Sequence, residues 1–200
     1  TNKINVVGLP QSGVKIKINP ENNEIMMSGA FVMKGYYKDK ERTDETIKDG
    51  WLCTGDQGKI DEDGYLYITG RVKDTFKTSK GEFIEPLGLE KFFGDTVEFE
   101  QICIVGLGNP QPMLLVVLSE SGKSTEKNVL KSMIENKLIN VNKDLVSYKR
   151  ISTIIFVKDD WNPENEILTP TMKIKRNKIN DKYCEKFKGW SDNIETIIWE

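Results

Sequence analysis

The feature that most constrains the fold is a change of hydrophobic pattern near residues 70–74 of this 200-residue chain. Before it, apolar and polar residues alternate over short segments such as VKIKI (residues 14–18), which is typical of half-buried strands. After it, strand-like segments are interleaved with segments whose apolar residues recur at helical spacing. We therefore predict an α+β fold in two domains: a small antiparallel β subdomain over residues 1–71 and a compact α+β domain over residues 72–200.

The clearest local signal in the first domain is a hairpin centred on the segment DEDG at residues 61–64. Strand-like residues flank it on both sides, and Gly64 can supply the positive φ that a tight turn needs. The Asp-rich segment does not fit a calcium-binding EF-hand loop. With Gly64 at loop position six, Lys59 and Gly70 would stand at positions one and twelve, where acidic ligands are required. We expect no metal site in this chain.

The second domain is predicted to contain strands and helices in the order β-β-α-β-β-α-β-α. The predicted ranges are strands at 75–78 and 82–84, a helix opened by Pro86, strands at 101–105 and 113–118, a helix over 124–141 with Ser124 as its N-cap, a strand at 151–157 and a closing helix over 173–187. Segments 121–124 and 106–108 resemble parts of nucleotide-binding glycine motifs. Val117 and Gln111 stand where those motifs need glycine, so neither segment qualifies.

Composition excludes several classes of chemistry and partner. The chain has no histidine, which rules out Ser-His-Asp and Cys-His catalysis within it. Its three cysteines are far apart, so we expect no disulfide framework and a cytoplasmic location. A net charge of −2 argues against a nucleic-acid partner. No apolar run approaches the roughly 20 residues of a membrane span. The chain starts with Thr1, which indicates a piece of a longer protein.

Three residues stand out as candidates for nucleotide binding. Asp56 follows a glycine in a Thr-Gly-Asp turn, and its carboxylate can accept hydrogen bonds from both hydroxyls of a ribose. Arg71 follows a predicted strand and offers several donors in a fixed geometry. Lys173 follows a Thr-Pro-Thr turn and could present its ammonium to a phosphate. Each also has a structural interpretation: Asp56 and Arg71, taken alone, as residues that support the local fold, and Lys173 as part of a solvated basic helix start.

Five segments in order carry a resemblance to a known family: GYY (35–37), GWLCTGD (50–56), DEDGYLYITGRVKD (61–74), FKTSKGEFIEP (76–86) and LTPTMKIKR (168–176). Over essentially its whole length the chain resembles the C-terminal part of an AMP-forming acyl-CoA synthetase of the long-chain fatty-acid type, in the adenylate-forming superfamily. The resemblance implies that residues 1–71 are the last β subdomain of a larger N-terminal domain. It also implies that residues 72–200 form the mobile C-terminal domain.

The resemblance assigns roles to individual residues. Asp56 and Arg71 would contact the ribose of ATP or acyl-AMP, Lys73 would be the hinge of the mobile domain, and Lys173 would be the catalytic lysine of adenylation. The loop with Lys80 and Gly81 would line the CoA side. The implied substrates are a fatty acid, ATP and CoA, with Mg bound together with ATP by a part of the protein upstream of this chain.

The sequence departs from the family pattern at three positions. Cys53 stands where relatives often have histidine, Lys80 where many have a small residue, and Met172 where the widespread pattern has glycine. We expect the 200 residues to be inactive alone, and peripheral membrane association is one expectation for the full-length enzyme. Two alternatives stay open: a fragment of an acyl-AMP ligase that loads a carrier protein, and a non-catalytic nucleotide-binding or interaction module.

Overall fold

The computed structural model describes residue 3 and residues 6–200, and it confirms the α+β fold class. The chain divides into two compact units, Thr1–Thr75 and Phe76–Glu200. The sequence-based boundary after Arg71 lies slightly before this division. None of the helices in the described part of the chain combines the length and apolar character of a membrane span.

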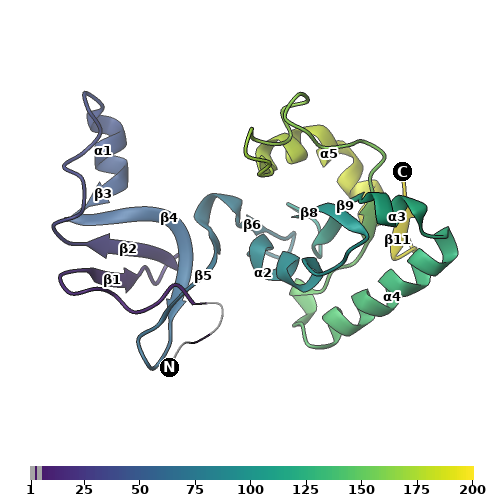
Figure 1. The fold of residues 1–200 in the computed structure, drawn as a ribbon, viewed down its shortest axis with the longest axis horizontal. Coiled ribbons are helices and arrows are strands. Elements are labelled where there is room, and N and C mark those ends of the chain that lie inside the picture. Colours follow the sequence, from purple (N-terminus) through teal and green to yellow (C-terminus); the bar gives the residue numbers. More distant parts are fainter. Residues whose placement is uncertain (1–2, 4–5) are drawn as a thin grey trace. The chain divides into compact units, whose positions relative to one another are not determined.

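The first unit is built on one antiparallel sheet (Figure 1). Its strands are β1 (Lys15–Ile18), β2 (Glu24–Ser28), β3 (Ile47–Lys48), β4 (Trp51–Ile60) and β5 (Leu66–Arg71). Their order is β1-β2-β4-β3, with β5 also paired to β4. Helix α1 (Lys40–Thr46) precedes β3, and the Asp39 side chain caps it by accepting a hydrogen bond from the Arg42 amide. The unit ends in the 3-10 helix η1 (Val72–Asp74).

The predicted hairpin between β4 and β5 is confirmed, and the Asp61 side chain organises its turn. The Asp61 carboxylate accepts hydrogen bonds from the Tyr65 amide at 2.9 Å and the Tyr67 hydroxyl at 3.1 Å. The Lys3 ammonium lies 2.6 Å from the same carboxylate. Gly64 has a φ of 85°, the left-handed conformation expected for the turn glycine. Asp61 therefore stabilises the turn, and Asp63 pairs with the same Lys3 ammonium at 2.6 Å.

The second unit contains a four-stranded sheet with strand order β11-β10-β9-β8. Its strands are β8 (Phe99–Val105), β9 (Met113–Leu118), β10 (Ile154–Phe156) and β11 (Ile197–Trp199), and β6 (Phe76–Lys77) and β7 (Phe83–Ile84) form a separate pair. Its helices are α2 (Pro86–Glu90), α3 (Glu120–Ser124), α4 (Lys127–Lys143) and α5 (Arg176–Ser191), with 3-10 turns η2 (Lys91–Phe93) and η3 (Ser147–Lys149). Within the four-stranded sheet, β8 and β9 are antiparallel, whereas β9–β10 and β10–β11 are parallel. The separate pair β6–β7 is antiparallel.

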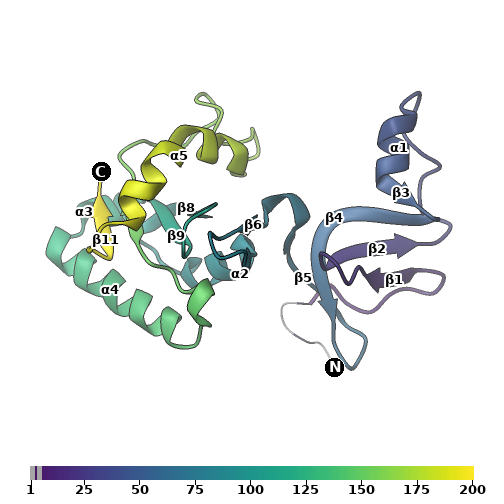
Figure 2. The same cartoon turned by 180° about the vertical axis from the view of Figure 1, so that it is seen from behind.

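Strand β9 is buried on both faces, which explains its continuous apolar run MLLVVL. Met113, Leu115 and Val117 pack with the buried face of α5, whereas Leu114 and Val116 pack with α2 and α4. The sheet of the second unit is thus covered by α5 on one face and by α2 and α4 on the other, as Figures 1 and 2 show.

Two sequence-based predictions for the second unit were wrong in detail, and one strand was missed. Helix α4 begins at Lys127 with Glu126 as its N-cap, so Ser124 does not cap it. Ser124 instead ends the short helix α3, where its hydroxyl donates to the Glu120 carbonyl at 2.7 Å. Helix α5 covers Arg176–Ser191, which leaves Lys173 in the loop before it. Strand β11 was not predicted.

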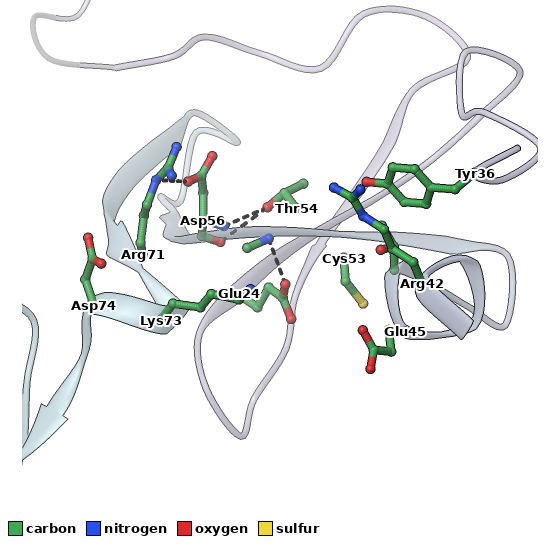
Figure 3. Close-up of a pocket in the computed structure, with 12 residues that line it drawn as sticks. Glu24, Tyr36, Arg42, Glu45, Cys53, Thr54, Asp56, Arg71, Lys73 and Asp74 are labelled. Carbon is green, nitrogen blue, oxygen red and sulfur yellow. Dashed lines mark hydrogen bonds and ion pairs between the residues drawn. The ribbon is translucent and has the colours of Figure 1, made fainter. Parts of the chain in front are cut away.

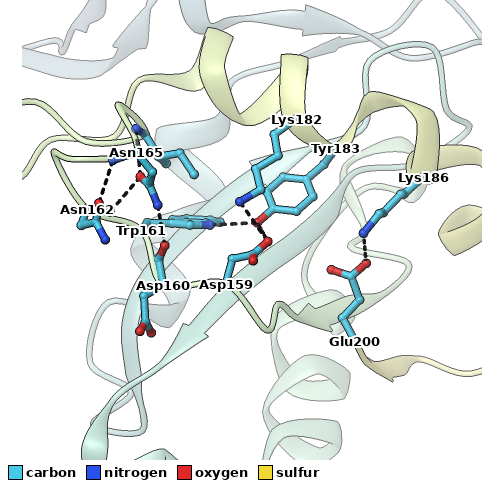
Figure 4. A network of polar contacts seen from close by, with 10 residues as sticks. Asp159, Asp160, Trp161, Asn162, Asn165, Lys182, Tyr183, Lys186 and Glu200 are labelled. Atoms are coloured by element: carbon cyan, nitrogen blue, oxygen red, sulfur yellow. Dashed lines mark hydrogen bonds and ion pairs between the residues drawn. The ribbon is translucent and has the colours of Figure 1, made fainter.

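A polar network fixes the segment before α5 against the helix itself (Figure 4). The buried Tyr183 hydroxyl accepts from Trp161 Nε1 at 3.2 Å and donates to Asp159 at 3.3 Å. Lys182 pairs with the same Asp159 carboxylate at 2.9 Å. The segment that leads toward Lys173 is therefore anchored to α5 at its start.

Candidate functional site

The first unit carries a pocket of about 510 Å³ (Figure 3). Strands β2, β4 and β5 contribute to it, together with α1, η1 and the loop before α1. Its lining residues are Glu24, Tyr36, Arg42, Glu45, Thr46, Cys53, Thr54, Gly55, Asp56, Arg71, Lys73 and Asp74. The volume falls within the range of sites for small-molecule ligands.

Asp56 and Arg71 meet in this pocket because they are direct partners in the β4–β5 ladder. Arg71 Nε lies 3.2 Å from Asp56 Oδ1. The Arg71 side chain is 68% exposed and that of Asp56 35% exposed, so both polar groups can be reached from solvent. The pair presents carboxylate acceptors and guanidinium donors side by side, which suits a ligand with neighbouring hydroxyl groups.

The backbone before Asp56 is held in an unusual shape by two side chains. Gly55 has a φ of 76°, and its amide donates to Glu24 Oε1 at 2.8 Å. The Thr54 hydroxyl donates to the Ile25 carbonyl at 2.8 Å and accepts from the Asp56 amide at 3.1 Å. These bonds tie β4 to β2 at a register irregularity and set the direction in which Asp56 leaves the sheet.

Arg42 and Tyr36 form the other end of the pocket. The Arg42 guanidinium lies over the Tyr36 ring at 4.0 Å from its centroid, a cation–π contact that Figure 3 shows from the side. The Tyr36 amide donates to Thr43 Oγ1 at 2.8 Å, which docks the loop before α1 onto the helix. Cys53 is half-buried between the two ends, and desolvation, followed by the charge of Glu24, raises the pKa of its thiol.

The structure brings three of the predicted site residues together. Asp56, Arg71 and Lys73 line the same pocket, and Lys73 lies in η1, immediately before the division between the units. Lys80, Gly81 and Lys173 belong to the second unit.

Lys80 and Gly81 lie in the turn that joins β6 to β7. Gly81 has a φ of 83°, and its amide donates to the Thr78 carbonyl at 3.0 Å. The Ser79 amide donates to the Asn109 carbonyl at 2.9 Å, which fixes the turn against the loop between β8 and β9. Lys80 is exposed at the tip of this turn.

Lys173 is exposed on a closed turn between Leu168 and Ile174, which form an antiparallel bridge. Two of its basic neighbours are neutralised: Arg176 by Glu90 at 2.6 Å and Lys178 by Glu166 at 2.8 Å. In the part of the chain that the structure describes, Lys173 has no ion-pair partner. The basic segment is therefore not uniformly solvated, and Lys173 retains a free ammonium on a fixed support.

Sequence reasoning assigned no role to Glu24, Arg42 or Glu45, which also line the pocket. Glu24 is brought to Gly55 by the irregular β2–β4 register, and no local sequence pattern predicts that register. Arg42 and Glu45 lie on α1, and the position of this helix beside β4 depends on tertiary contacts that no local pattern predicts. Tyr36 belongs to the GYY segment, which was noted only as part of the resemblance.

Comparisons with known proteins agree on one family. The family model for the AMP-binding enzyme C-terminal domain matches residues 73–192. The chain is 29% identical to fatty acyl-CoA synthetase B of Dictyostelium discoideum, with 94% of this chain and 31% of that protein covered. It is also 29% identical to the chloroplastic long-chain-fatty-acid–[acyl-carrier-protein] ligase AEE15 of Arabidopsis thaliana, over 92% of this chain and 29% of that one.

A solved structure with the same fold is the A domain of carboxylic acid reductase from Segniliparus rugosus, in complex with AMP and a co-purified carboxylic acid. The TM-score is 0.73 at 25% identity, with 90% of this chain and 31% of that chain covered. The chain thus spans about a third of the length of the proteins it matches.

Proposed function

Because this chain belongs to the family of AMP-binding enzyme C-terminal domains, we propose that it is the C-terminal part of a long-chain-type fatty acid–CoA ligase. The reaction converts a fatty acid and ATP into acyl-AMP and pyrophosphate, and then transfers the acyl group to the CoA thiol with release of AMP. The observation that carries this proposal is the Asp56–Arg71 pair at the pocket of the first unit.

We assign the ribose of ATP and of acyl-AMP to this pair. The Asp56 carboxylate would accept hydrogen bonds from the ribose hydroxyls, and the Arg71 guanidinium would donate to the same region. Because the two residues are ladder partners, the distance between them is set by the sheet and does not depend on a flexible loop. This is the kind of preorganised support that a nucleotide site requires.

Lys173 is the proposed catalytic lysine of the adenylation step. Its ammonium would stabilise the negative charge that develops around the α-phosphate as the carboxylate attacks and pyrophosphate leaves. Its exposed position on a fixed turn and the absence of an ion pair in the described structure support this role. Withdrawal of the lysine would then make room for the thiol in the second step.

The remaining roles follow the same proposal. Lys73 would be the hinge, since it precedes the division between the two units, and Lys80 and Gly81 would line the CoA side. The first unit would be the last β subdomain of a larger N-terminal domain. Mg would be held with ATP outside these 200 residues. We propose that these residues alone bind ATP weakly and do not turn over.

The test measures the two half-reactions separately in the complete protein, with Lys173→Ala and the control Lys175→Ala. Lys173→Ala should slow acyl-AMP formation by roughly 10²- to 10³-fold, the loss typical of one electrostatic group at a reacting centre. It should leave thioester formation from supplied acyl-AMP unchanged. Lys175 also lacks an ion pair among the described residues, so Lys175→Ala controls for the loss of one positive charge from the same segment. Equal loss of both half-reactions would contradict the assignment.

The identity of the acceptor is a second question, because one relative is a ligase for acyl-carrier protein. Thioester formation with CoA supports the proposal. Accumulation of acyl-AMP with CoA, and thioester formation only with a carrier protein, would favour the carrier-loading alternative. Failure to form acyl-AMP from any long-chain fatty acid, with nucleotide binding intact, would favour a non-catalytic module.

A further inference from the structure

The turn that carries Lys173 is closed mainly by one other residue, Thr169. The Thr169 amide donates to the Lys173 carbonyl at 2.8 Å, and the Lys173 amide donates to Thr169 Oγ1 at 3.0 Å. The Thr169 carbonyl also accepts from the Met172 amide at 2.9 Å. Thr169 therefore holds Lys173 at both of its backbone polar groups, and one of these two bonds depends on the threonine side chain.

The base of this turn is anchored in the core of the second unit. Leu168 is fully buried, and Ile174 packs against the core cluster that lies under α5. One step further along the chain, the Lys175 amide donates to the Ile167 carbonyl at 2.8 Å. Between these anchors, only residues 169–173 project outward, so the direction of Lys173 depends on how the tip of the turn is closed.

Closure of the tip requires one residue, Met172, to adopt a disfavoured backbone conformation. Met172 adopts a φ of 62°, the left-handed conformation that residues with a β-carbon rarely take. The Met172 side chain is exposed, so burial of that side chain does not stabilise this conformation. The bond from the Lys173 amide to Thr169 Oγ1 is adjacent to the disfavoured residue and helps to hold it in place.

We propose that Thr169 is a positioning residue that orients Lys173 for adenylation through its side-chain oxygen. This inference rests on the proposed role of Lys173. Thr169 itself contacts no reacting group in the proposal. Because Thr169 is only half-buried, replacement of its hydroxyl leaves no cavity in the core, and the variants should fold.

The test compares Thr169→Val and Thr169→Ser in the complete protein. Valine keeps the branched shape but removes the acceptor, whereas serine keeps the acceptor. Thr169→Val should lower kcat for acyl-AMP formation roughly 2- to 10-fold, as expected for one hydrogen bond, with little change in the KM for ATP. Thioester formation from supplied acyl-AMP should be unchanged, and Thr169→Ser should behave like the wild type.

A second readout does not depend on activity. Hydrogen–deuterium exchange at the Lys173 amide should be faster in Thr169→Val and normal in Thr169→Ser. Thr125→Val is the control, because its hydroxyl donates to the Ser121 carbonyl, in a turn that does not involve Lys173.

Three results would overturn the inference: normal adenylation by Thr169→Val, equal loss of both half-reactions, or unchanged exchange at Lys173. If Lys173→Ala itself adenylates normally, the proposed function of the lysine fails instead, and the exchange experiment still reports whether Thr169 holds the turn.

Discussion

Asp56 and Arg71 stand directly opposite each other in the β4–β5 ladder, with Arg71 Nε 3.2 Å from Asp56 Oδ1. The neighbouring Gln57 is buried and secures the same stretch of β4, because its side chain donates to the Asn22 carbonyl and accepts from the Thr75 hydroxyl. The sheet and these side-chain bonds therefore hold the pair in place before any ligand binds, and its energetic role can be tested apart from the fold.

Asp56→Ala should weaken AMP binding without unfolding the protein. Loss of hydrogen bonds to a charged acceptor costs about 1.5–3 kcal/mol, which corresponds to roughly 10- to 150-fold in Kd. Isothermal titration calorimetry on the complete protein measures this change. Asp44→Ala is the matched control, since Asp44 is an exposed acid of the same unit that pairs with Lys40 and does not line the pocket. Equal affinities for the two variants would contradict the ribose assignment.

Glu90→Ala should destabilise the second unit strongly. Glu90 and Arg176 are 11% and 17% exposed, and Glu90 accepts two short bonds from the guanidinium and one from the Ile104 amide. Removal of one partner of such a buried pair costs about 3–5 kcal/mol, because the other charge remains buried. Urea denaturation should show this loss.

The control for Glu90→Ala is Glu166→Ala. This variant breaks the exposed ion pair with Lys178, which lies two residues after Arg176 in α5. Exposed pairs contribute little, so the urea midpoint should barely move. Similar midpoints for the two variants would mean that the Arg176–Glu90 pair does not anchor α5.

The Asp61 hairpin should lose stability in acid. The Lys3 ammonium, together with the Tyr65 amide and the Tyr67 hydroxyl, lowers the pKa of Asp61 from 3.8 to about 2. Because the folded pKa lies below the unfolded value, this carboxylate stabilises the hairpin above pH 3.8, and the contribution is lost as the pH falls toward 2. An NMR titration of the Asp61 carboxyl should give a midpoint near 2, and Lys3→Gln should raise it. An Asp61 titration midpoint that is unchanged in Lys3→Gln would argue against the Lys3–Asp61 ion pair.

Sequence reasoning located the features that depend on local pattern. The run Met113–Leu118 indicated a strand, and the DEDG segment with Gly64 indicated a hairpin with a strand on either side. Sequence reasoning failed where the limits of a helix, or the approach of two segments, depend on tertiary contacts. Ser124 and Glu126 can both cap a helix, and the choice falls to Glu126 because Ser124 is already the last residue of α3. In α3, an added β-carbon at Gly122 would lie 2.3 Å from the Glu98 carbonyl oxygen, a close approach that sequence alone does not reveal.

Strand β11 and the pocket residue Glu24 also depend on tertiary contacts that a local sequence pattern does not reveal. Ile197–Trp199 is too short to be recognised by pattern and becomes a strand only by parallel pairing with β10. Glu24 enters the pocket through an irregular register with β4. Side-chain chemistry marked Asp56, Arg71 and Lys173 as candidates for nucleotide binding. The specific roles of these residues and of Lys73, Lys80 and Gly81 came from the resemblance, and they stay predictions until the variants are measured.

Cys53 offers a chemical test of the pocket as the nucleotide site. Its thiol lines the pocket and is half-buried, and desolvation, followed by the Glu24 carboxylate, raises its pKa above that of an ordinary thiol. Alkylation by iodoacetamide should therefore be slow near neutral pH and should accelerate as the pH rises, since the thiolate is the reactive form.

Bound AMP should protect Cys53 from alkylation. At a concentration ten times Kd, occupancy should slow the reaction roughly 10-fold, because only the free protein reacts. Cys184 is exposed on α5 and serves as the internal reference, which AMP should leave unchanged. Mass spectrometry of the two cysteine-containing peptides measures both rates in one sample. Asp56→Ala should cut the protection at the same AMP concentration to about 2-fold or less, because its Kd for AMP is expected to be at least 10-fold weaker. Equal slowing at both cysteines, or none at Cys53, would place the nucleotide elsewhere.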